Sequence, residues 1–258
     1  MGMRYGIGIG IAVPNKVPAG HFASSGQGAL SQTLPQSTAL AFWTPALLPG
    51  LFAWYRADLG VTTVSGNVSA WADQSGSGND LAESIVIDRP TYHASGGANN
   101  QAYIKWDPTV DAGNQSLGNA AVTIPANHDI FVVARALNTA YPSRLWMIGS
   151  EQLYATAPLT LTYYNTGVSA SLTAGVDFAI QCTANGASSE LRYNGASQGT
   201  GTESGSASSI TIGNYTGVAG NNSWDGFIYE WFGCNVVTNA DRLKVQSYLS
   251  GRYGVTFS

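Results

Sequence analysis

The chain has 258 residues, of which 44% are hydrophobic and only 10% are charged. This composition excludes a disordered chain, which combines few apolar residues with a high net charge. The formal net charge of −4, with 11 Lys and Arg against 15 Asp and Glu, argues against nucleic-acid binding. No apolar run reaches the roughly 18 residues of a membrane-spanning helix, so we expect no membrane insertion.

Residues 5–13 alternate between large apolar side chains and Gly or Ala. Alternation with period two predicts a strand, but glycine makes such a strand weak in isolation. We therefore predict that the segment docks on another protein, with an intramolecular strand or a disordered terminus as the alternatives. The predicted docking residues are Tyr5, Ile7, Ile9, Ile11 and Val13. The same region lacks the long apolar core and cleavage site of a signal peptide.

Residues 14–49 are rich in Gly, Ser, Gln, Ala and Pro and show no hydrophobic period. This composition predicts an extended connector with local apolar anchors at residues 39–43 and 47–48. We accordingly expect an N-terminal docking arm and linker over residues 1–48 and one folded domain over residues 49–258.

From residue 51 onward, short strand-like segments are separated by Gly, Asn, Asp, Ser and Pro. Such spacing without intervening helices predicts an antiparallel β-sandwich. The pair Asn194-Gly195 is typical of a two-residue hairpin turn. The predicted strands are 51–56, 67–72, 102–107, 130–136, 145–149, 159–164, 168–172, 176–183, 190–193, 209–213 and 227–237.

The last strand and the segment after it predict how the domain closes. Residues 227–237 carry apolar side chains at both parities, which indicates a central strand that is covered on both faces. Thr238 and Asp241 form a capping-box pattern, so we predict a helix over residues 241–252 that stops at Gly251 or Gly254. Its apolar side, which we expect to pack on the sandwich, is formed by Leu243, Val245, Tyr248 and Leu249.

Glycan-hydrolysing enzymes of the sandwich type use paired carboxylates on one strand face, in a Glu-x-Asp-x-Glu pattern. The chain has no such pattern, and Glu230 is alone on its strand. We expect Glu230 to make a structural hydrogen bond or an ion pair with Arg56 or Arg135. The three histidines lie far apart, so a zinc site is not expected. Cys182 and Cys234 lie in predicted strands as buried thiols, or as a disulfide if those strands are neighbours.

Two loops contain candidate binding residues. Calcium prefers carboxylate and carbonyl oxygens, which Asp73, Asn79 and Asp80 offer in one loop. The alternative is a turn held by hydrogen bonds between the side chains of Asp73 and Asn79 and their own backbone. Strand tryptophans such as Trp54, Trp71, Trp106 and Trp231 are expected in the core. The candidate glycan contacts are Tyr215, Asn221, Asn222 and Trp224, with an ordinary β-connection as the alternative.

Five motifs appear in the order found in laminin-G-like domains, which have a concanavalin A-like jelly-roll fold. They are LFAWYRAD at 51–58, VSAWADQSGSGND at 68–80, RPTY at 89–92, DGFIYE at 225–230 and ADRLKVQSYLSGRYG at 240–254. The resemblance covers residues 49–258 and implies an all-β, antiparallel jelly-roll β-sandwich with one C-terminal closing helix. Many domains of this kind bind calcium, so Ca²⁺ is the one cofactor considered, although none is required.

This fold serves lectins, glycanases, adhesins and virion proteins, so it does not fix the function. The glycine-rich arm, the connector and the missing signal peptide favour a non-enzymatic bacteriophage virion protein. It would be a capsid decoration, a head fibre or a tail attachment protein. We expect its partners to be other virion proteins and copies of itself, with a trimer as the working assumption, and a host-surface glycan as a further ligand. The alternative is a secreted or surface carbohydrate-binding module.

Overall fold

The computed structural model describes residues 43–110, 114–137, 143–157, 159–214 and 223–258. By its internal contacts the chain divides into two compact units, Met1–Ala41 and Phe42–Ser258, and every described residue belongs to the second. Among these residues, no helix combines the length and the apolar character needed to cross a membrane.

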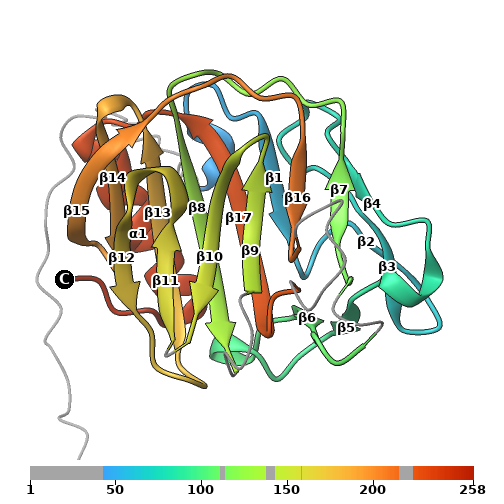
Figure 1. The fold of residues 1–258 in the computed structure, drawn as a ribbon. Coiled ribbons are helices and arrows are strands. Elements are labelled where there is room, and N and C mark those ends of the chain that lie inside the picture. The colour runs from blue at the N-terminus through green and yellow to red at the C-terminus, as the bar shows by residue number, and fades with distance from the viewer. Residues whose placement is uncertain (1–42, 111–113, 138–142, 158, 215–222) are drawn as a thin grey trace, which may run out of the picture. The chain divides into compact units, whose positions relative to one another are not determined.

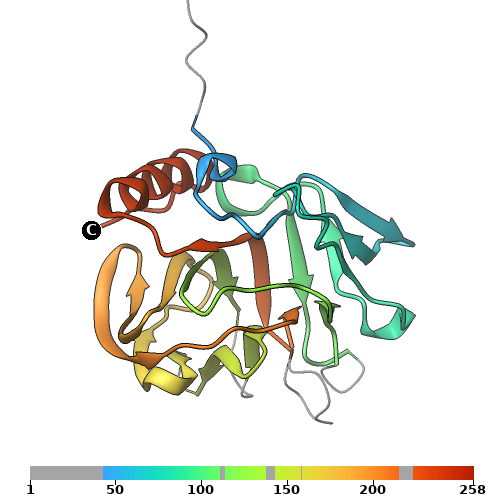
Figure 2. The same ribbon diagram turned by 90° about the horizontal axis from the view of Figure 1, so that it is seen from above.

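The strands of this unit form two antiparallel layers packed face to face, and helix α1 lies outside one layer (Figures 1 and 2). We call the layer under the helix the helix-side sheet and the other layer the open-side sheet. The helix-side sheet contains β1 (Ala53–Arg56), β5 (Thr91–His93), β6 (Tyr103–Trp106), β8 (His128–Ala136), β13 (Asp177–Ala184), β14 (Gly186–Tyr193), β15 (Ala196–Glu203) and β17 (Gly226–Asn235). The predicted all-β sandwich is confirmed.

The open-side sheet continues from the helix-side sheet through a single pair, Asn67 of β3 opposite Thr91 of β5. Its strands are β2 (Val61–Val64), β3 (Asn67–Trp71), β4 (Leu81–Ala82), β7 (Leu117–Asn119), β9 (Ser143–Ile148), β10 (Glu151–Thr156), β11 (Thr160–Tyr163), β12 (Val168–Ser171) and β16 (Ile210–Ile212). Short 3-10 turns add η1 (Pro45–Leu47), η2 (Val86–Asp88), η3 (Ala98–Asn100) and η5 (Tyr164–Thr166).

The main core fills the space between the two sheets. Its largest fully buried side chains include five tryptophans, which replace water-exposed aromatic surface with close packing. They are Trp71, Trp106, Trp146, Trp224 and Trp231. Three of the four strand tryptophans expected in the core therefore lie there, and the fourth, Trp54, is buried on the helix side.

Strand β17 is the central strand that its two apolar faces predicted. It pairs with β8 along one edge and with β1 and β6 along the other. Its register against β8 shifts between Ile228 and Glu230, so Tyr229 is the extra residue of a β-bulge. Because of the bulge, Tyr229 and Glu230 both face helix α1, whereas Ile228 and Trp231 point between the sheets. Strict alternation along residues 227–237 predicts Tyr229 and Trp231 on one face, and the bulge makes this prediction wrong.

Helix α1 (Asn239–Tyr253) closes the outer face of the helix-side sheet. The Thr238 side chain accepts the backbone N–H of Asp241, and Gly254 ends the helix in the left-handed conformation at φ 70°. Both caps were predicted. The buried residues of the helix are Val245, Leu249 and Tyr253. Leu243 is 57% exposed, so its predicted place on the packed side was wrong.

Both cysteines are free and buried. Cys182 of β13 faces the space between the sheets, and Cys234 of β17 faces the helix. The two thiols lie on opposite faces of one sheet, with β8 between their strands, so the reading as two buried thiols is confirmed. Burial raises the pKa of both thiols, which keeps them protonated and unreactive.

Candidate functional site

An open groove of about 670 Å³ lies on the helix side of the sandwich, where η1, β1, η3 and α1 meet. Its chemical character comes from two aromatic residues, three cationic residues and two amides. These residues are Trp43, Tyr248, Arg56, Lys244, Arg252, Asn99 and Gln101. The described residues that line it include no Asp or Glu.

The aromatic part of the groove consists of Trp43 and Tyr248. Trp43 precedes η1. Tyr248 lies on α1 one helical turn before Arg252, so the side chains of Tyr248 and Arg252 share a face of the helix. The ring centroids of Trp43 and Tyr248 are 5.9 Å apart at 68°, an edge-to-face arrangement. Both residues are half-buried, so each ring keeps surface toward the groove.

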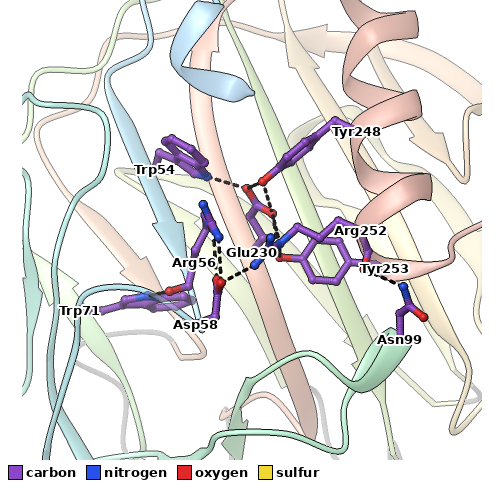
Figure 3. Close-up of polar contacts among 9 residues, drawn as sticks. All are labelled: Trp54, Arg56, Asp58, Trp71, Asn99, Glu230, Tyr248, Arg252 and Tyr253. Carbon is purple, nitrogen blue, oxygen red and sulfur yellow. Dashed lines mark hydrogen bonds and ion pairs between the residues drawn. The ribbon is translucent and has the colours of Figure 1, made fainter. Parts of the chain in front are cut away.

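Beneath the groove lies the carboxylate of Glu230, which is 0% exposed. It accepts hydrogen bonds from Trp54 Nε1 at 2.5 Å, and from the hydroxyls of Tyr248 at 2.9 Å and Tyr253 at 2.7 Å (Figure 3). Burial raises the pKa of Glu230, and the hydrogen bonds from Tyr253, Trp54 and Tyr248 oppose that rise. Glu230 therefore fixes the hydroxyl end of Tyr248, a lining residue, from below.

The two arginines of the groove are joined through Asp58. Arg56 donates Nε and Nη2 hydrogen bonds to Asp58 at 3.1 and 2.8 Å, and Arg252 Nη2 reaches the same carboxylate at 2.5 Å (Figure 3). Burial works to raise the pKa of Asp58, but the hydrogen bonds and charges of Arg56 and Arg252 outweigh it and lower the pKa. Asn99 Nδ2 donates to the carbonyl of Arg252 at 3.2 Å and ties η3 to the end of the helix.

Glu230 has the structural role that was expected, but its partners differ from the two arginines named. Arg56 pairs with Asp58, and Arg135 pairs with Asp177 at 2.6 Å. The arginine nearest to Glu230 is Arg252, at 3.9 Å. The bulge in β17 turns Glu230 toward the helix that carries Arg252, and Arg56, which lies opposite Glu230 in register, pairs with Asp58 instead.

The predicted glycan contacts do not form a site in the described residues. Tyr215, Asn221 and Asn222 lie outside them. Trp224 is 0% exposed and packs in the main core with Phe178, 6.4 Å between ring centroids. Its ring is therefore closed to a sugar, and the contact predicted for Trp224 was wrong.

The docking residues predicted near the N-terminus are Tyr5, Ile7, Ile9, Ile11 and Val13, and all five lie outside the described residues. Their role stays a prediction.

The loop predicted as a calcium site is held by its own hydrogen bonds. The Asp73 carboxylate accepts backbone N–H groups of Ser75 at 2.8 Å and Asn79 at 3.0 Å. A further N–H comes from Trp54 at 2.9 Å, and Asp80 accepts the N–H of Asp73 at 2.8 Å. This geometry fits the turn alternative. Across the described ranges no group of three or more His, Cys, Asp or Glu is placed to hold a metal, and calcium binding at this loop stays a prediction.

A second polar cluster is enclosed between the sheets. His128 Nε2 lies 3.0 Å from Glu151 Oε2, and the Tyr163 hydroxyl donates to Glu151 Oε1 at 2.7 Å. Burial and the charge of Glu151 raise the pKa of Glu203, while a hydrogen bond from Asn165 opposes them. His128, Glu151, Tyr163 and Glu203 are each less than one tenth exposed, so this cluster is closed to a ligand in the structure.

The groove was hard to predict from the sequence. Trp43 was expected only as an apolar anchor in the connector, and Tyr248 only as a packing residue of the helix. Asn99 and Gln101 belonged to no motif, and Arg252 appeared only within the segment 240–254. The one available signal was the set of polar side chains on the last turns of the helix, which ends beside the start of the domain.

No protein-family model matches the chain, and no curated protein matches it. Among solved structures, a complex of an arabinofuranosidase with arabinofuranosyl-α-1,2-xylobiose is 12% identical, with a TM-score of 0.55 over 80% of this chain and 60% of that chain. Domain 4 of AbnA, a GH43 arabinanase from Geobacillus stearothermophilus solved with arabinotriose, is 11% identical, with a TM-score of 0.48 over 77% of this chain and 98% of that chain.

A sialidase from Trypanosoma rangeli, solved with sialic acid, is 12% identical, with a TM-score of 0.49 over 79% of this chain and 33% of that chain. The chain thus spans about a third of the sialidase chain and 60% of the arabinofuranosidase chain. The likeness to the arabinofuranosidase is one of fold, and the comparisons give no link to a laminin-G family or to a bacteriophage.

The likeness to the arabinofuranosidase overturns the prediction that the chain is not an enzyme. That enzyme is built on a similar fold, so the sandwich is a framework for enzymes as well. The prediction relied on a missing pattern of carboxylates along one strand. That reasoning was too narrow, because a fold also brings carboxylates together from separate strands, as with Glu151 of β10 and Glu203 of β15.

Proposed function

We propose that the unit Phe42–Ser258 binds carbohydrate in the groove between η1, β1, η3 and α1. One observation carries this proposal: an open groove of about 670 Å³ combines aromatic rings with fixed hydrogen-bonding groups. Sugars present apolar ring faces and a rim of hydroxyls, so they fit a site with both kinds of group. Trp43 and Tyr248 supply aromatic surface, and Asn99, Gln101 and Arg56 supply donors and acceptors.

The groove is preorganised, which limits the entropy lost on binding. Glu230 holds the Tyr248 hydroxyl, and Asp58 holds Arg56 and Arg252 in place. The arabinofuranosidase of similar fold was solved with a bound arabinofuranosyl xylobiose, which supports the choice of carbohydrate as the ligand class.

The proposal is tested by measuring binding of the protein to a panel of immobilised polysaccharides, and comparing Trp43→Ala with Tyr164→Ala. Tyr164 is a matched control because it is 54% exposed on η5 and does not line the groove. Loss of an aromatic contact costs about 1–2 kcal/mol, so we expect Trp43→Ala to weaken binding about tenfold and Tyr164→Ala to leave it unchanged. Equal binding by Trp43→Ala and the parent protein would show that the groove is not the site.

The virion role remains a separate proposal, motivated by the alternating apolar segment at residues 5–13. In that role the segment docks on a virion protein, and the sandwich faces outward with its groove available to a glycan of the host surface. Removal of residues 1–48 tests it. Particles that still incorporate the shortened chain would rule out docking by this segment.

A further inference from the structure

The charges of the chain are distributed unevenly around the groove. The whole chain has a net charge of −4 and only 11 Lys and Arg residues. Three of these 11, Arg56, Lys244 and Arg252, line the groove, and none of its described lining residues is acidic. In a protein with so few cations, three of them in one groove favour the binding of an anion there.

Asp58 offsets only part of this positive charge, since one carboxylate serves two guanidinium groups. A guanidinium has five N–H donors, and among the described residues the bonds to Asp58 take two of those of Arg56. Other N–H donors of Arg56 therefore remain for a ligand, and Asp58 already fixes the direction of the Arg56 side chain. Lys244 is 53% exposed, and its ion pair with Asp241 is a surface pair that contributes little.

Glu230 lies beneath the groove and does not line it. Its oxygens accept hydrogen bonds from Trp54, Tyr248 and Tyr253, and Arg252 Nε lies 3.9 Å from its carboxylate. The side chains that line the groove thus present positive charge next to the aromatic surface of Trp43.

We propose that the groove selects an acidic glycan, whose sugar units carry carboxylate groups. This inference rests on the proposed carbohydrate function and adds the ligand class to it. The planar guanidinium of Arg56 matches the geometry of a carboxylate, and Lys244 adds a mobile charge at the rim. Trp43 then contacts the face of a sugar ring, so the site recognises both the ring and its carboxylate.

The experiment measures binding of the full chain to polygalacturonate, alginate and hyaluronate, and to carboxyl-reduced forms of the same polymers. Dextran sulfate is included as a polyanion without carboxylates. We expect at least one of the acidic polymers to bind at least tenfold more tightly than its reduced form, and more weakly as the salt concentration rises. Dextran sulfate is expected to bind at least tenfold more weakly than that polymer.

Two charge-removing variants on the same helix separate the groove from general charge. Lys244→Gln removes a groove cation, whereas Arg242→Gln removes a cation that does not line the groove. We expect Lys244→Gln and Arg56→Gln each to weaken binding to the acidic polymer several-fold, and Arg242→Gln to leave it unchanged. Retained thermal unfolding midpoints of all three variants confirm that they are folded.

The outcomes distinguish this inference from the proposed function. Equal, Trp43-dependent binding of the acidic and reduced polymers overturns the acidic preference and leaves carbohydrate binding in place. Equal loss in Arg242→Gln and Lys244→Gln, or equal binding of dextran sulfate, shows general polyanion attraction and also overturns the preference. Binding to none of these polymers, with Trp43-dependent binding to neutral glycans, overturns it too. Absence of binding to any glycan overturns both.

Discussion

At the scale of single residues, the most consequential side chain is Glu230, because three donors depend on its carboxylate. Replacing it by alanine leaves Trp54 Nε1 and the hydroxyls of Tyr248 and Tyr253 without that partner in a buried space. We expect Glu230→Ala to lower the free energy of unfolding by about 3–5 kcal/mol. Urea unfolding followed by tryptophan fluorescence measures the loss.

The conservative variant gives the control for this prediction. Glu230→Gln keeps the shape and one acceptor oxygen and removes the charge whose burial raises the pKa of Glu230. We expect a clearly smaller loss of stability than in Glu230→Ala. An alanine variant as stable as the glutamine variant would mean that the three hydrogen bonds add nothing to the fold.

His128 makes a pH-dependent contribution to stability. Burial lowers the pKa of His128, but the hydrogen bond and charge of Glu151 outweigh it, so the folded-state pKa lies above the usual 6.5. A raised histidine pKa gives stability that is complete below about 6.5 and is lost as the pH rises through the folded-state value. We expect the unfolding free energy of the parent protein to fall above pH 6.5, and to fall less in His128→Gln. Parallel curves for the two proteins would contradict this role of His128.

At the scale of elements, Gly213 is a glycine at which an added side chain would clash with the core. It has φ 85°, and an added Cβ would lie 1.9 Å from Nε1 of the Trp106 ring. Gly66 has nearly the same φ of 84° with no atom within 4 Å, so it isolates the backbone cost. We expect Gly66→Ala to lower the unfolding free energy by about 1 kcal/mol and Gly213→Ala by at least about 1–3 kcal/mol more. Equal losses of unfolding free energy in the two variants, measured by thermal or urea unfolding, would show that the Trp106 side chain moves to accommodate the added methyl group.

Elements that are specified by a few neighbouring residues could be predicted from the sequence. The Asn194-Gly195 turn, the helix caps at Thr238 and Gly254, and the apolar strand β8 are of this kind. The strand Ala196–Glu203 was missed because its Gly, Ser and Thr residues resemble a loop, and its structure comes from pairing with β14. The bulge at Tyr229 was missed for a related reason. The register of β17 is set by the neighbouring strand β8, and the apolar pattern of residues 227–237 does not show the shift.

At the scale of the whole molecule, the candidate site could not be predicted because it is assembled by the fold. Trp43, Asn99 and Tyr248 are far apart in the chain and meet only after the helix packs on the sheet. The sequence-based search looked for motifs within one loop or strand, and it therefore selected Trp224, which the fold buries. A site whose lining residues come from several separate elements has no single local pattern to find.

The same view of the molecule predicts that the unit Phe42–Ser258 is sufficient for folding and for glycan binding. The core between the sheets, the apolar cluster under helix α1 and every described lining residue of the groove lie within it. Domains with a core of their own fold independently, so removal of residues 1–41 is expected to leave the thermal unfolding midpoint and the glycan affinity unchanged. Calorimetry and the polysaccharide binding assay, performed on the full chain and on residues 42–258, make the comparison. A lower midpoint for the shorter chain would show that residues 1–41 stabilise the sandwich, and a lower affinity at an unchanged midpoint would show that they contribute to the ligand site.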